Sequence, residues 1–581
     1  MQTENEYMTI ADDKSNRKKI NPLLIFIPSA VLLMVAIAVV AALIFFNSPK
    51  NKVMRAFAVA LGDSFPFAEY IKSINPVTSK KTSFFDDAQT IEQLKEACDN
   101  RQFYSENSFK LNSVKTNNGS TYTADLSGIK LDSALYVDKP GRRIQYRLTP
   151  GYLIIKGPQF IFTQEDNIFS FHSPSLIDTP FTIDTENFGP DYNASEFADI
   201  IGYRFPANAE DDIKFNIFDM TEAYESADGS LTDNFDKSDL KALYDAIEVK
   251  KTGNKELISS SVGQSEECSE YLVTLPEDKL GKIILPIIES YDKKNEDFIK
   301  DNHDLISALC MINGSDIDSL LSGYSNELDS FMKKADELFT EDITLTVWLN
   351  KNDELKKAEC DLFTWEIAGA GESEGSYLLS FSYRDETNND LDIIISRKNT
   401  FIKNKTKAKS NKSEYSIRID DISEEKELIN ISFLSEYDCE ADTMIINGST
   451  TFEDTRLTFD GECDVTTDNK NGPMITFDFD HINFTYYENG NEIGNMDISD
   501  EFTFSGLENA VYEELPSAGT PLFKMSRNEF YSAVSDGVNN YLDNTWAFGS
   551  SGSSGGATVT PDQVEDMFSN PLLLYLLRSG L

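Results

Sequence analysis

The hydrophobic and polar positions along this chain change period several times, and each change predicts a different kind of element. The first pattern is an unbroken apolar run, Leu23–Phe46, which has 24 residues and carries no ionisable side chain. A helix of this length spans about 36 Å, enough for a bilayer hydrocarbon core of about 30 Å. The run is longer than the apolar part of a cleavable signal peptide. We therefore interpret residues 22–46 as an uncleaved transmembrane anchor.

Basic residues on both sides of the run indicate its orientation. Four precede it and three follow it: Lys14, Arg17, Lys18 and Lys19, then Lys50, Lys52 and Arg55. This small excess favours a cytoplasmic N-terminus under the positive-inside rule. The pattern thus predicts a single-pass protein of the cell membrane, with residues 1–21 as a cytoplasmic tail and the C-terminal part extracellular.

After the anchor, the spacing indicates helices and then an antiparallel meander. Two helices are expected between residues 51 and 98, where apolar residues recur at helical spacing. From Phe109 to Phe171 the period changes to two, and turn dipeptides such as Pro150-Gly151 separate the short apolar runs. The stretch 173–201 is rich in Asp, Asn and Pro and is expected to be an irregular loop. We assign residues 47–250 to a first helix-plus-meander module.

A helical segment and a longer meander follow. Residues 251–341 are assigned to the helical segment, and residues 342–548 to a second antiparallel meander module with a terminal helix. Within this meander the apolar phase slips between Phe479 and Ile482. A slip of one residue in a period of two indicates an inserted residue, so we interpret Asp480-His481 as a β-bulge.

Two capping boxes mark the last helices. Ser526 and Glu529 begin one that should end near Leu542, and Thr560-Pro561 begins the other. Between them, residues 549–557 are a Gly/Ser linker. The segment 558–581 ends in the apolar run LLLYLL, which is too short to span a bilayer and too apolar for water. We expect this C-terminal docking helix to pack intramolecularly.

The charge balance excludes one class of partner. The chain has 98 acidic and 52 basic residues and a formal net charge of −46. Such a field repels phosphate backbones, so we expect no nucleic-acid partner. The six cysteines are scattered and lack the paired spacing that structural zinc requires. Cys439 and Cys463 lie in neighbouring strand candidates, where a bridge is one alternative, although isolated buried thiols are favoured.

Motifs for catalysis are weak in this sequence. Gly371–Gly375 fits G-x-S-x-G around Ser373, but a strand follows it, which favours a hairpin turn over a nucleophile elbow. A histidine base would have to be His172, His303 or His481. The acidic clusters DNHD (301–304) and DETNNDLD (385–392) resemble calcium loops only in composition.

Two further groups have a ligand interpretation and a plainer one. Asp478, Asp480 and His481 could ligate a cation at the bulge, but alternating acids on a solvent-facing sheet are favoured. Trp348 and Trp365 could line a groove, but aromatic residues in strands more often belong to the core. We therefore assign no catalytic, cofactor-binding or metal residues and expect no cofactor.

A family resemblance enters at three stretches. Residues 166–197 (DNIFSFHSPSLIDTPFTIDTENFGPDYNASEF), 270–291 (EYLVTLPEDKLGKIILPIIESY) and the helix NKVMRAFAVAL resemble single-pass envelope proteins of Gram-positive, clostridial-type bacteria. In outline these are similar to LolA-like lipoprotein-carrier sheets. The resemblance implies long curved sheets and carries no functional residues. With it, the expected fold is α+β: an N-terminal transmembrane helix followed by two helix-plus-antiparallel-meander modules with curved sheets.

Three function classes stay open. The first is a membrane-anchored extracytoplasmic protein, held in the membrane by Leu23–Phe46, that binds an apolar ligand, a lipid or a peptide, in a curved sheet without catalysis. The alternative is a structural or adhesive surface protein that uses its acidic face. The third is an envelope hydrolase that uses carboxylates. We favour the first, because no catalytic motif stands in a suitable context.

Overall fold

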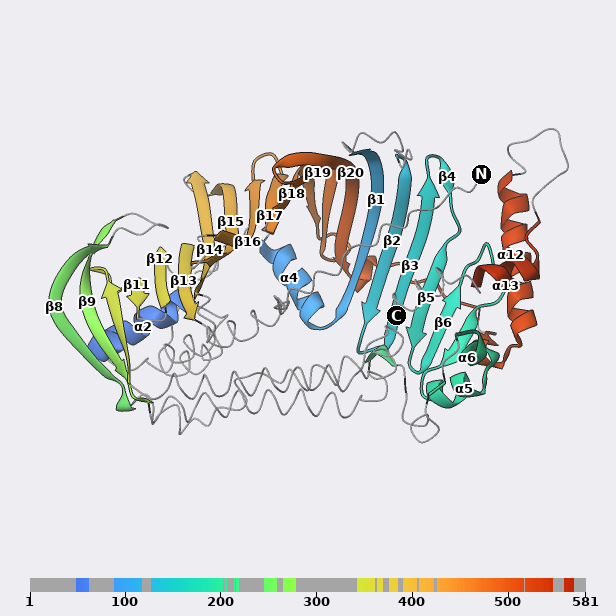
Figure 1. Ribbon diagram of the computed structural model, residues 1–581, viewed down its shortest axis with the longest axis horizontal. Coiled ribbons are helices and arrows are strands. Elements are labelled where there is room, and N and C mark those ends of the chain that lie inside the picture. The colour runs from blue at the N-terminus through green and yellow to red at the C-terminus, as the bar shows by residue number, and fades with distance from the viewer. Residues whose placement is uncertain are drawn as a thin grey trace, which may run out of the picture.

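The described part of the chain forms one curved sheet. The computed structural model describes residues 49–61, 88–116, 127–201, 204–205, 214, 216–218, 245–258, 265–277, 342–360, 363–368, 376–384, 390–404, 407–422, 426–452, 454–516, 518–546 and 558–568. Their strands join in a single 21-stranded sheet. The sheet is elongated and curves along its length, with helices at both ends and below its middle in the view of Figure 1.

The strands are antiparallel neighbours for almost the whole length of the sheet. The first part of the chain gives β1 (Gln102–Thr116), β2 (Ile129–Asp138), β3 (Arg143–Tyr152), β4 (Ile155–Lys156), β5 (Phe160–Glu165), β6 (Ile168–His172) and β7 (Phe181–Asp184). The second part gives β8 (Glu248–Ile258), β9 (Glu266–Leu275), β10 (Ile343–Leu349), β11 (Leu355–Glu359), β12 (Phe363–Ala368), β13 (Ser376–Arg384), β14 (Asp390–Asn404), β15 (Lys407–Asp421), β16 (Lys426–Asp438), β17 (Thr443–Phe452), β18 (Thr455–Asp468), β19 (Met474–Glu488), β20 (Asn491–Gly506) and β21 (Thr520–Pro521).

Pairing gives the sheet a simple spatial order. The strands β8 to β20 lie side by side in chain order, and β20 then pairs with β1, the first strand of the chain. From β1 the order continues through β2, β3, β5, β6 and β7 to the short parallel strand β21. The pairing of β1 with β20 joins distant parts of the chain, and a side-chain hydrogen bond between them links Asn107 to Asp500, 393 positions apart. Among the described strands, the first therefore lies in the middle of the sheet: β1 to β7 form one half, and β8 to β20 run from the far edge back to β1.

Helices cover three places on the sheet. They are α2 (Pro49–Leu61), α4 (Ala88–Asp99), α5 (Phe188–Ala194), α6 (Glu196–Ile201), α12 (Arg527–Trp546) and α13 (Pro561–Phe568), with 3-10 turns η3 (Leu507–Asn509) and η4 (Leu522–Lys524). Helix α2 lies against β8, β10 and β11, and α4 against β1, β19 and β20. Helices α12 and α13 stand at the other end, beside α5 and α6 (Figure 1).

The two faces of the sheet differ in polarity. Antiparallel partners point to the same side, so the register defines an apolar face and a polar face. The apolar face carries Phe433, Phe459 and Phe484, and α4 packs on it through Leu94 and Ile91. The polar face carries Ser and Thr pairs such as Ser396 with Ser416 and Ser432 with Ser449, whose hydroxyl oxygens lie 2.6 and 2.8 Å apart. Burial of one face against helices explains why the strands form.

Aromatic side chains extend the apolar face to the end covered by α12. The ring of Phe171 lies 5.1 Å from that of Phe162 and 6.5 Å from that of Phe181. Phe181 in turn lies 5.8 Å from Phe530 of α12. At the other end, Phe57 of α2 stacks on Trp365 at 6.0 Å. Both ends of the sheet are therefore closed by helix-to-sheet aromatic contacts, one stacked and one tilted, with centroid separations in the range that aromatic pairs prefer.

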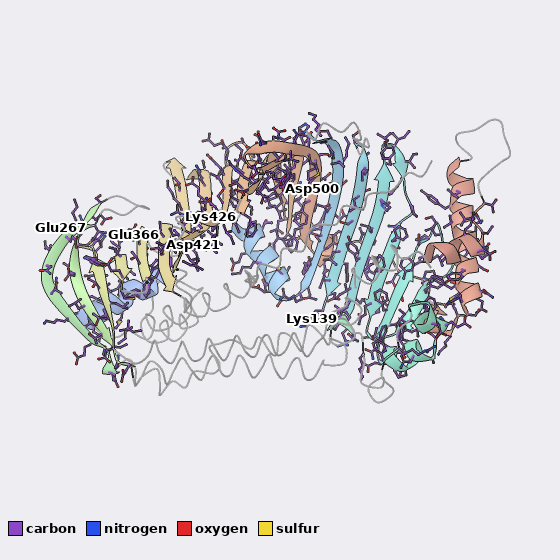
Figure 2. All side chains as sticks on the ribbon, in the orientation of Figure 1. Lys139, Glu267, Glu366, Asp421, Lys426 and Asp500 are labelled. Carbon is purple, nitrogen blue, oxygen red and sulfur yellow. The ribbon has the colours of Figure 1, made fainter. Side chains whose placement is uncertain are left out.

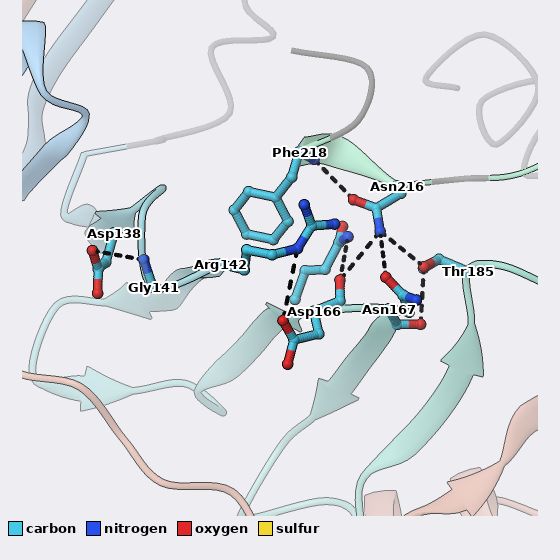
Figure 3. A network of polar contacts seen from close by, with 9 residues as sticks. Asp138, Gly141, Arg142, Asp166, Asn167, Thr185, Asn216 and Phe218 are labelled. Carbon is cyan, nitrogen blue, oxygen red and sulfur yellow. Dashed lines mark hydrogen bonds and ion pairs between the residues drawn. The ribbon is translucent and has the colours of Figure 1, made fainter. Parts of the chain in front are cut away.

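A polar network fixes the turns between β2, β3, β5 and β6 (Figure 3). Asn216 donates from Nδ2 to the carbonyl of Asp166 at 3.2 Å and to Asn167 Oδ1 at 3.1 Å. Its Oδ1 accepts from the backbone N–H of Phe218 at 3.0 Å. The guanidinium of Arg142 lies 5.2 Å over the Phe218 ring. These contacts rigidify the strand ends where β3 begins, because they satisfy buried polar groups that would otherwise lose hydration.

The predicted fold class was wrong. The sequence predicted an α+β chain with a transmembrane helix and two separate helix-plus-meander modules. The described residues instead form one predominantly β structure, because β1 of the first predicted module pairs along its length with β20 of the second. Short-range periodicity indicates that a strand forms but does not indicate which distant strand it joins, so it could not show this connection.

The predicted anchor at residues 22–46 lies outside the described residues. The helices that the structure does describe include none that combines the length and the apolar character needed to cross a membrane. The described helices give no support to the single-pass topology, the signal anchor or the orientation derived from it, and these expectations are withdrawn.

Two predictions that depend on local sequence, a β-bulge and a helix capping box, are confirmed. The bulge at Asp480-His481 is confirmed, since the β19–β20 register shifts between Phe479 and Ile482. The capping box at Ser526 is confirmed, since Ser526 N–H donates to Glu529 Oε2 at 2.8 Å and α12 follows.

The loop expected at 173–201 was wrong, because it contains β7, α5 and α6. The turn expected at Pro150-Gly151 was also wrong, because β3 continues through both residues to Tyr152.

Candidate functional site

An exposed apolar patch lies on the apolar face over β15 to β19. Each of its side chains is 37–53% exposed; the apolar patch consists of Tyr415, Ile431, Phe433, Phe452, Leu457 and Tyr486. Tyr415 lies directly opposite Phe433, and Leu457 directly opposite Tyr486. Contiguous exposed apolar surface is uncommon on soluble proteins and marks interaction or ligand sites.

One row of aromatic rings runs through this patch. Tyr415, Phe433, Gly448, Phe459 and Phe484 stand at one register position across β15 to β19. The ring centroids of Phe433 and Phe459 are 6.1 Å apart, and those of Phe459 and Phe484 are 5.9 Å apart. These distances are within the range of favourable aromatic pairs. The row therefore forms a continuous apolar track that crosses the strands.

Gly448 makes this track possible. A Cβ at position 448 would lie 2.3 Å from Cε1 and Cζ of Phe459, and 3.0 Å from the backbone oxygen of Ser432. The Phe459 ring therefore lies on the bare backbone of β17, in the space that any side chain would fill. A strand glycine commonly marks a close approach of this kind.

Helix α4 sets the boundary of the patch. Beneath it, Cys463, Val465 and Phe479 are 2–8% exposed. These residues continue the same strands and the same face as Leu457 and Tyr486, whose side chains are at least 40% exposed. The sequence pattern is thus the same inside and outside the boundary, and the difference in exposure follows from where α4 packs.

A cation stands at one end of the aromatic row. Arg397 of β14 lies opposite Tyr415, with its guanidinium carbon 5.3 Å from the ring centroid. Its Nε donates to Asn399 Oδ1 at 3.4 Å, and the same oxygen accepts from Ser413 Oγ at 2.9 Å. Cation–π contact holds the guanidinium over the ring. The site therefore combines an apolar track with a positive charge at its end.

A carboxyl group lies within the covered part of the apolar face. Asp500 of β20, labelled in Figure 2, stands opposite Phe479 and Phe109. Burial raises the pKa of Asp500, and the hydrogen bond from Asn107 Nδ2 at 2.8 Å opposes this effect. The folded chain thus favours the protonated acid more than an exposed aspartate would.

The histidines proposed from the sequence do not gather into a site. His172 is 6% exposed, and burial lowers its pKa. His481 is exposed on the polar face, and its Nδ1 lies 3.0 Å from Asp497 Oδ1. His303 lies outside the described residues. Asp478 and Asp480 join no group of three or more potential metal ligands anywhere in the described residues.

The other candidates belong to the scaffold. Ser373 and the cluster at 301–304 lie outside the described residues, as does most of the 385–392 cluster. The strands that flank Ser373, β12 and β13, pair antiparallel, as expected for a hairpin. Cys439 and Cys463 are not bridged to each other. Trp348 is 4% exposed and Trp365 stacks on Phe57, so both have the core role that was favoured.

Arg397 and Gly448 were missed at the sequence level. Each lies in a strand candidate or next to one, but neither departs from the local pattern. Their importance follows from the residues opposite them, which single-strand periodicity does not identify.

Comparison with known proteins gives weak matches. No family model and no curated protein matches the chain. Solved structures that match include Pseudomonas aeruginosa OpdQ (6% identity, 70% of this chain and 97% of that chain, TM-score 0.19) and the CymD monoaromatic hydrocarbon channel (6%, 77% and 98%, TM-score 0.17). Acinetobacter baumannii OccAB4 matches at 5% identity over 70% of this chain and 97% of that chain, with a TM-score of 0.12. At these TM-scores the likeness carries no argument about fold or mechanism.

The family expectation is corrected here. No family model and no curated protein supports the resemblance to single-pass envelope proteins and LolA-like sheets, and the described helices include none that could span a membrane, so the resemblance is withdrawn. The predicted location, a single-pass protein of the cell membrane with a cytoplasmic N-terminus and an extracellular remainder, is withdrawn with it.

Proposed function

We propose that this chain is a non-enzymatic binding protein that holds an amphiphile, a single acyl chain with an anionic headgroup, on the apolar patch. The observation that carries the proposal is the set of six large apolar side chains, exposed at neighbouring register positions on one face of a curved sheet. Covering such surface removes apolar area from water, which is the main driving force for binding an acyl chain.

The length of the aromatic row fits one acyl chain. Tyr415 and Phe484 stand on strands four positions apart, β15 and β19. At about 4.8 Å per strand, the row is about 19 Å long. One leaflet of a bilayer has a hydrocarbon depth of about 15 Å, half of the full core. An acyl chain of membrane length therefore fits along the row and ends close to Arg397.

Arg397 supplies the polar recognition. A guanidinium has five N–H donors, and the Nε–H is the one that binds Asn399. The planar fork of the remaining donors suits a carboxylate or phosphate. In a chain of net charge −46, a cation next to an apolar track favours an anionic headgroup at that point.

The test is binding of a fluorescent fatty-acid analogue to the full-length chain. The double variant Phe433→Ser/Leu457→Ser removes two contacts from the apolar patch. Each side chain is about 60% buried before binding, so each would gain about 1 kcal/mol from a ligand that covers it. The variant should therefore bind roughly 20-fold more weakly.

The matched control is Ile445→Ser. Ile445 is 40% exposed, close to the 38% of Phe433. Its side chain points to the polar face, because Met444 and Ile446 on either side of it pack against the core cluster on the apolar face. This variant should bind like the parent. Equal loss of binding in both variants, or no loss in either, would refute the proposed site.

The C-terminal segment is a competing occupant. Helix α13 docks on α12, where Ser535 Oγ and Asn539 Nδ2 donate to the carbonyl of Val559 at 2.8 and 2.7 Å. The apolar run predicted to dock, within 558–581, continues beyond α13 and outside the described residues. Deletion of residues 569–581 should leave affinity for the analogue unchanged under our proposal. A marked gain in affinity would assign the patch to the chain's own tail.

A further inference from the structure

The hairpin that joins β3 to β4 ends in an exposed apolar tip. Tyr152 pairs with Ile155, so the turn consists of Leu153 and Ile154 alone. The four residues of this hairpin tip are 44%, 53%, 99% and 54% exposed in chain order. Ile129, opposite Tyr152 on β2, adds further exposed apolar surface. In Figure 1 the tip lies at the upper edge of the sheet, by the label β4.

The turn is built from residues that disfavour it. Leu153 has a φ of +54°, the left-handed region that L-residues with a Cβ avoid. Two-residue hairpin turns normally use glycine, asparagine or aspartate at such a position. Leu153 here adds backbone strain to the unfavourable exposure of the apolar side chains of both turn residues. Backbone strain at an exposed turn indicates that the residues of this turn have a function.

The hairpin tip is held rigidly in spite of this strain. Leu153 N–H donates to the carbonyl of Gly128 at 2.7 Å, and Gly157 N–H to that of Pro150 at 2.7 Å. The hydroxyl of Tyr541, in α12, donates to the carbonyl of Lys156 at 2.9 Å. A preorganised loop loses little conformational entropy when it binds, so the tip is ready for a partner.

Three lysines stand in one row directly behind the hairpin tip. Lys110 of β1 lies opposite Lys130 of β2, Lys130 lies opposite Gly151, and Gly151 pairs with Lys156 of β4. All three lysines are exposed on the polar face. Like charges directly opposite each other destabilise a sheet. In a chain of net charge −46, this local cluster of positive charge favours an anionic partner within a Debye length of the tip.

We infer that the hairpin tip inserts into the surface of an anionic lipid bilayer, with Ile154 deepest and the lysine row at the headgroups. An apolar point in front of basic residues is the arrangement that binds an acidic membrane surface, since the apolar residues enter the acyl boundary and the cations meet lipid phosphates. The long lysine stems can lie along the apolar surface while their ammonium groups stay at the headgroup level.

A lipid surface fits these observations better than a protein groove. Protein interfaces deplete lysine and favour large aromatic anchors at their core. The hairpin tip instead carries aliphatic residues at its most exposed point and a row of lysines directly behind it. This inference is independent of the proposed ligand, because the hairpin tip and the apolar patch share no residue and lie on different strands.

The test places a reporter at the hairpin tip of the full-length chain. Ile154→Trp is mixed with vesicles that contain brominated lipids, of either phosphatidylcholine alone or phosphatidylcholine with phosphatidylserine. Quenching of the added indole, after subtraction of the parent signal, reports contact of position 154 with acyl chains. The matched control is Ile445→Trp, at a 40% exposed position on the polar face.

We expect quenching at position 154 in the anionic vesicles and none at position 445. The triple variant Lys110→Gln/Lys130→Gln/Lys156→Gln, made in the Ile154→Trp background, should bind these vesicles roughly 100-fold more weakly, since each lysine near an anionic surface contributes about fivefold. Circular dichroism of each variant verifies that it is folded. An indole at 154 that stays in water with anionic vesicles overturns the inference and points to a protein partner. Equal quenching at 154 and 445 overturns it as well, because contact is then not specific to the tip.

Discussion

Substitution of Gly448 tests the geometry of the aromatic row directly. In Gly448→Ala the new Cβ would lie 2.3 Å from two ring atoms of Phe459, about 1 Å inside ordinary van der Waals contact. Overpacking of this kind destabilises proteins by about 1–3 kcal/mol, whereas replacing a strand glycine by alanine otherwise stabilises by about 0.5–1 kcal/mol. The net expectation is a loss of about 1–2 kcal/mol, and a displaced Phe459 ring should also weaken binding of the fatty-acid analogue.

Urea unfolding of the parent and the variant measures this loss, provided that the slope of the transition does not change. The matched control is Gly461→Ala in the neighbouring strand β18, where the nearest atoms to a new Cβ lie at 3.2 Å. This variant should be destabilised by about 1 kcal/mol less than Gly448→Ala. If Gly448→Ala is as stable as the parent and binds the analogue normally, the close contact of Phe459 with the β17 backbone does not exist in solution.

Two further predictions concern charged groups on the apolar face. Burial raises the pKa of Asp500, so the folded protein loses stability as the pH rises and this buried carboxyl must ionise. Asp500→Asn removes the ionisation and should therefore be more stable than the parent at pH 7 and equally stable near pH 3. The midpoints of urea unfolding at the two pH values measure this difference. A lower stability at pH 7 would contradict this. Arg397→Gln should weaken binding of a fatty acid roughly tenfold and leave a fatty alcohol of equal length unaffected, as titration calorimetry can measure; equal weakening of both ligands would rule out the headgroup role.

Features that depend on neighbours in the chain could be predicted from the sequence. The bulge at Asp480-His481 follows from a slip in a period of two, and the slip remains visible without any tertiary information. The start of α12 follows from Ser526 and Glu529, which bond to each other's backbone. Both signals are local because the interactions that produce them are local.

The joining of the sheet could not be predicted in this way. Strand β1 pairs with β20, and the hydrogen-bonded residues Asn107 and Asp500 of these strands are 393 positions apart. Neither segment has a sequence pattern that identifies the other as its partner. Strand β8 was also missed, because its residues EVKKTGNKELI are mostly exposed and lack regular alternation. Among the described strands, β8 is an edge strand that pairs with β9 alone, and edge strands are often charged, which hides the usual pattern.

The two surfaces that carry our proposals were hidden for different physical reasons. The apolar patch has an ordinary alternating pattern, and only the position of α4 decides that Leu457 is exposed while Val465 is buried. The hairpin tip was hidden because Leu153 and Ile154 are the opposite of turn residues, so Pro150-Gly151 attracted the turn prediction instead. A turn that is formed by residues of low turn propensity can be recognised only once the pairing of the flanking strands is known.

Mass spectrometry of lipid extracts from the purified full-length chain can detect an amphiphile bound to the apolar patch. We expect a single-chain anionic amphiphile to copurify with the parent and with Ile445→Ser, and its occupancy to fall sharply in Phe433→Ser/Leu457→Ser. If no amphiphile copurifies, and added fatty acid binds the parent no better than the double variant, the apolar patch is not a lipid-binding site.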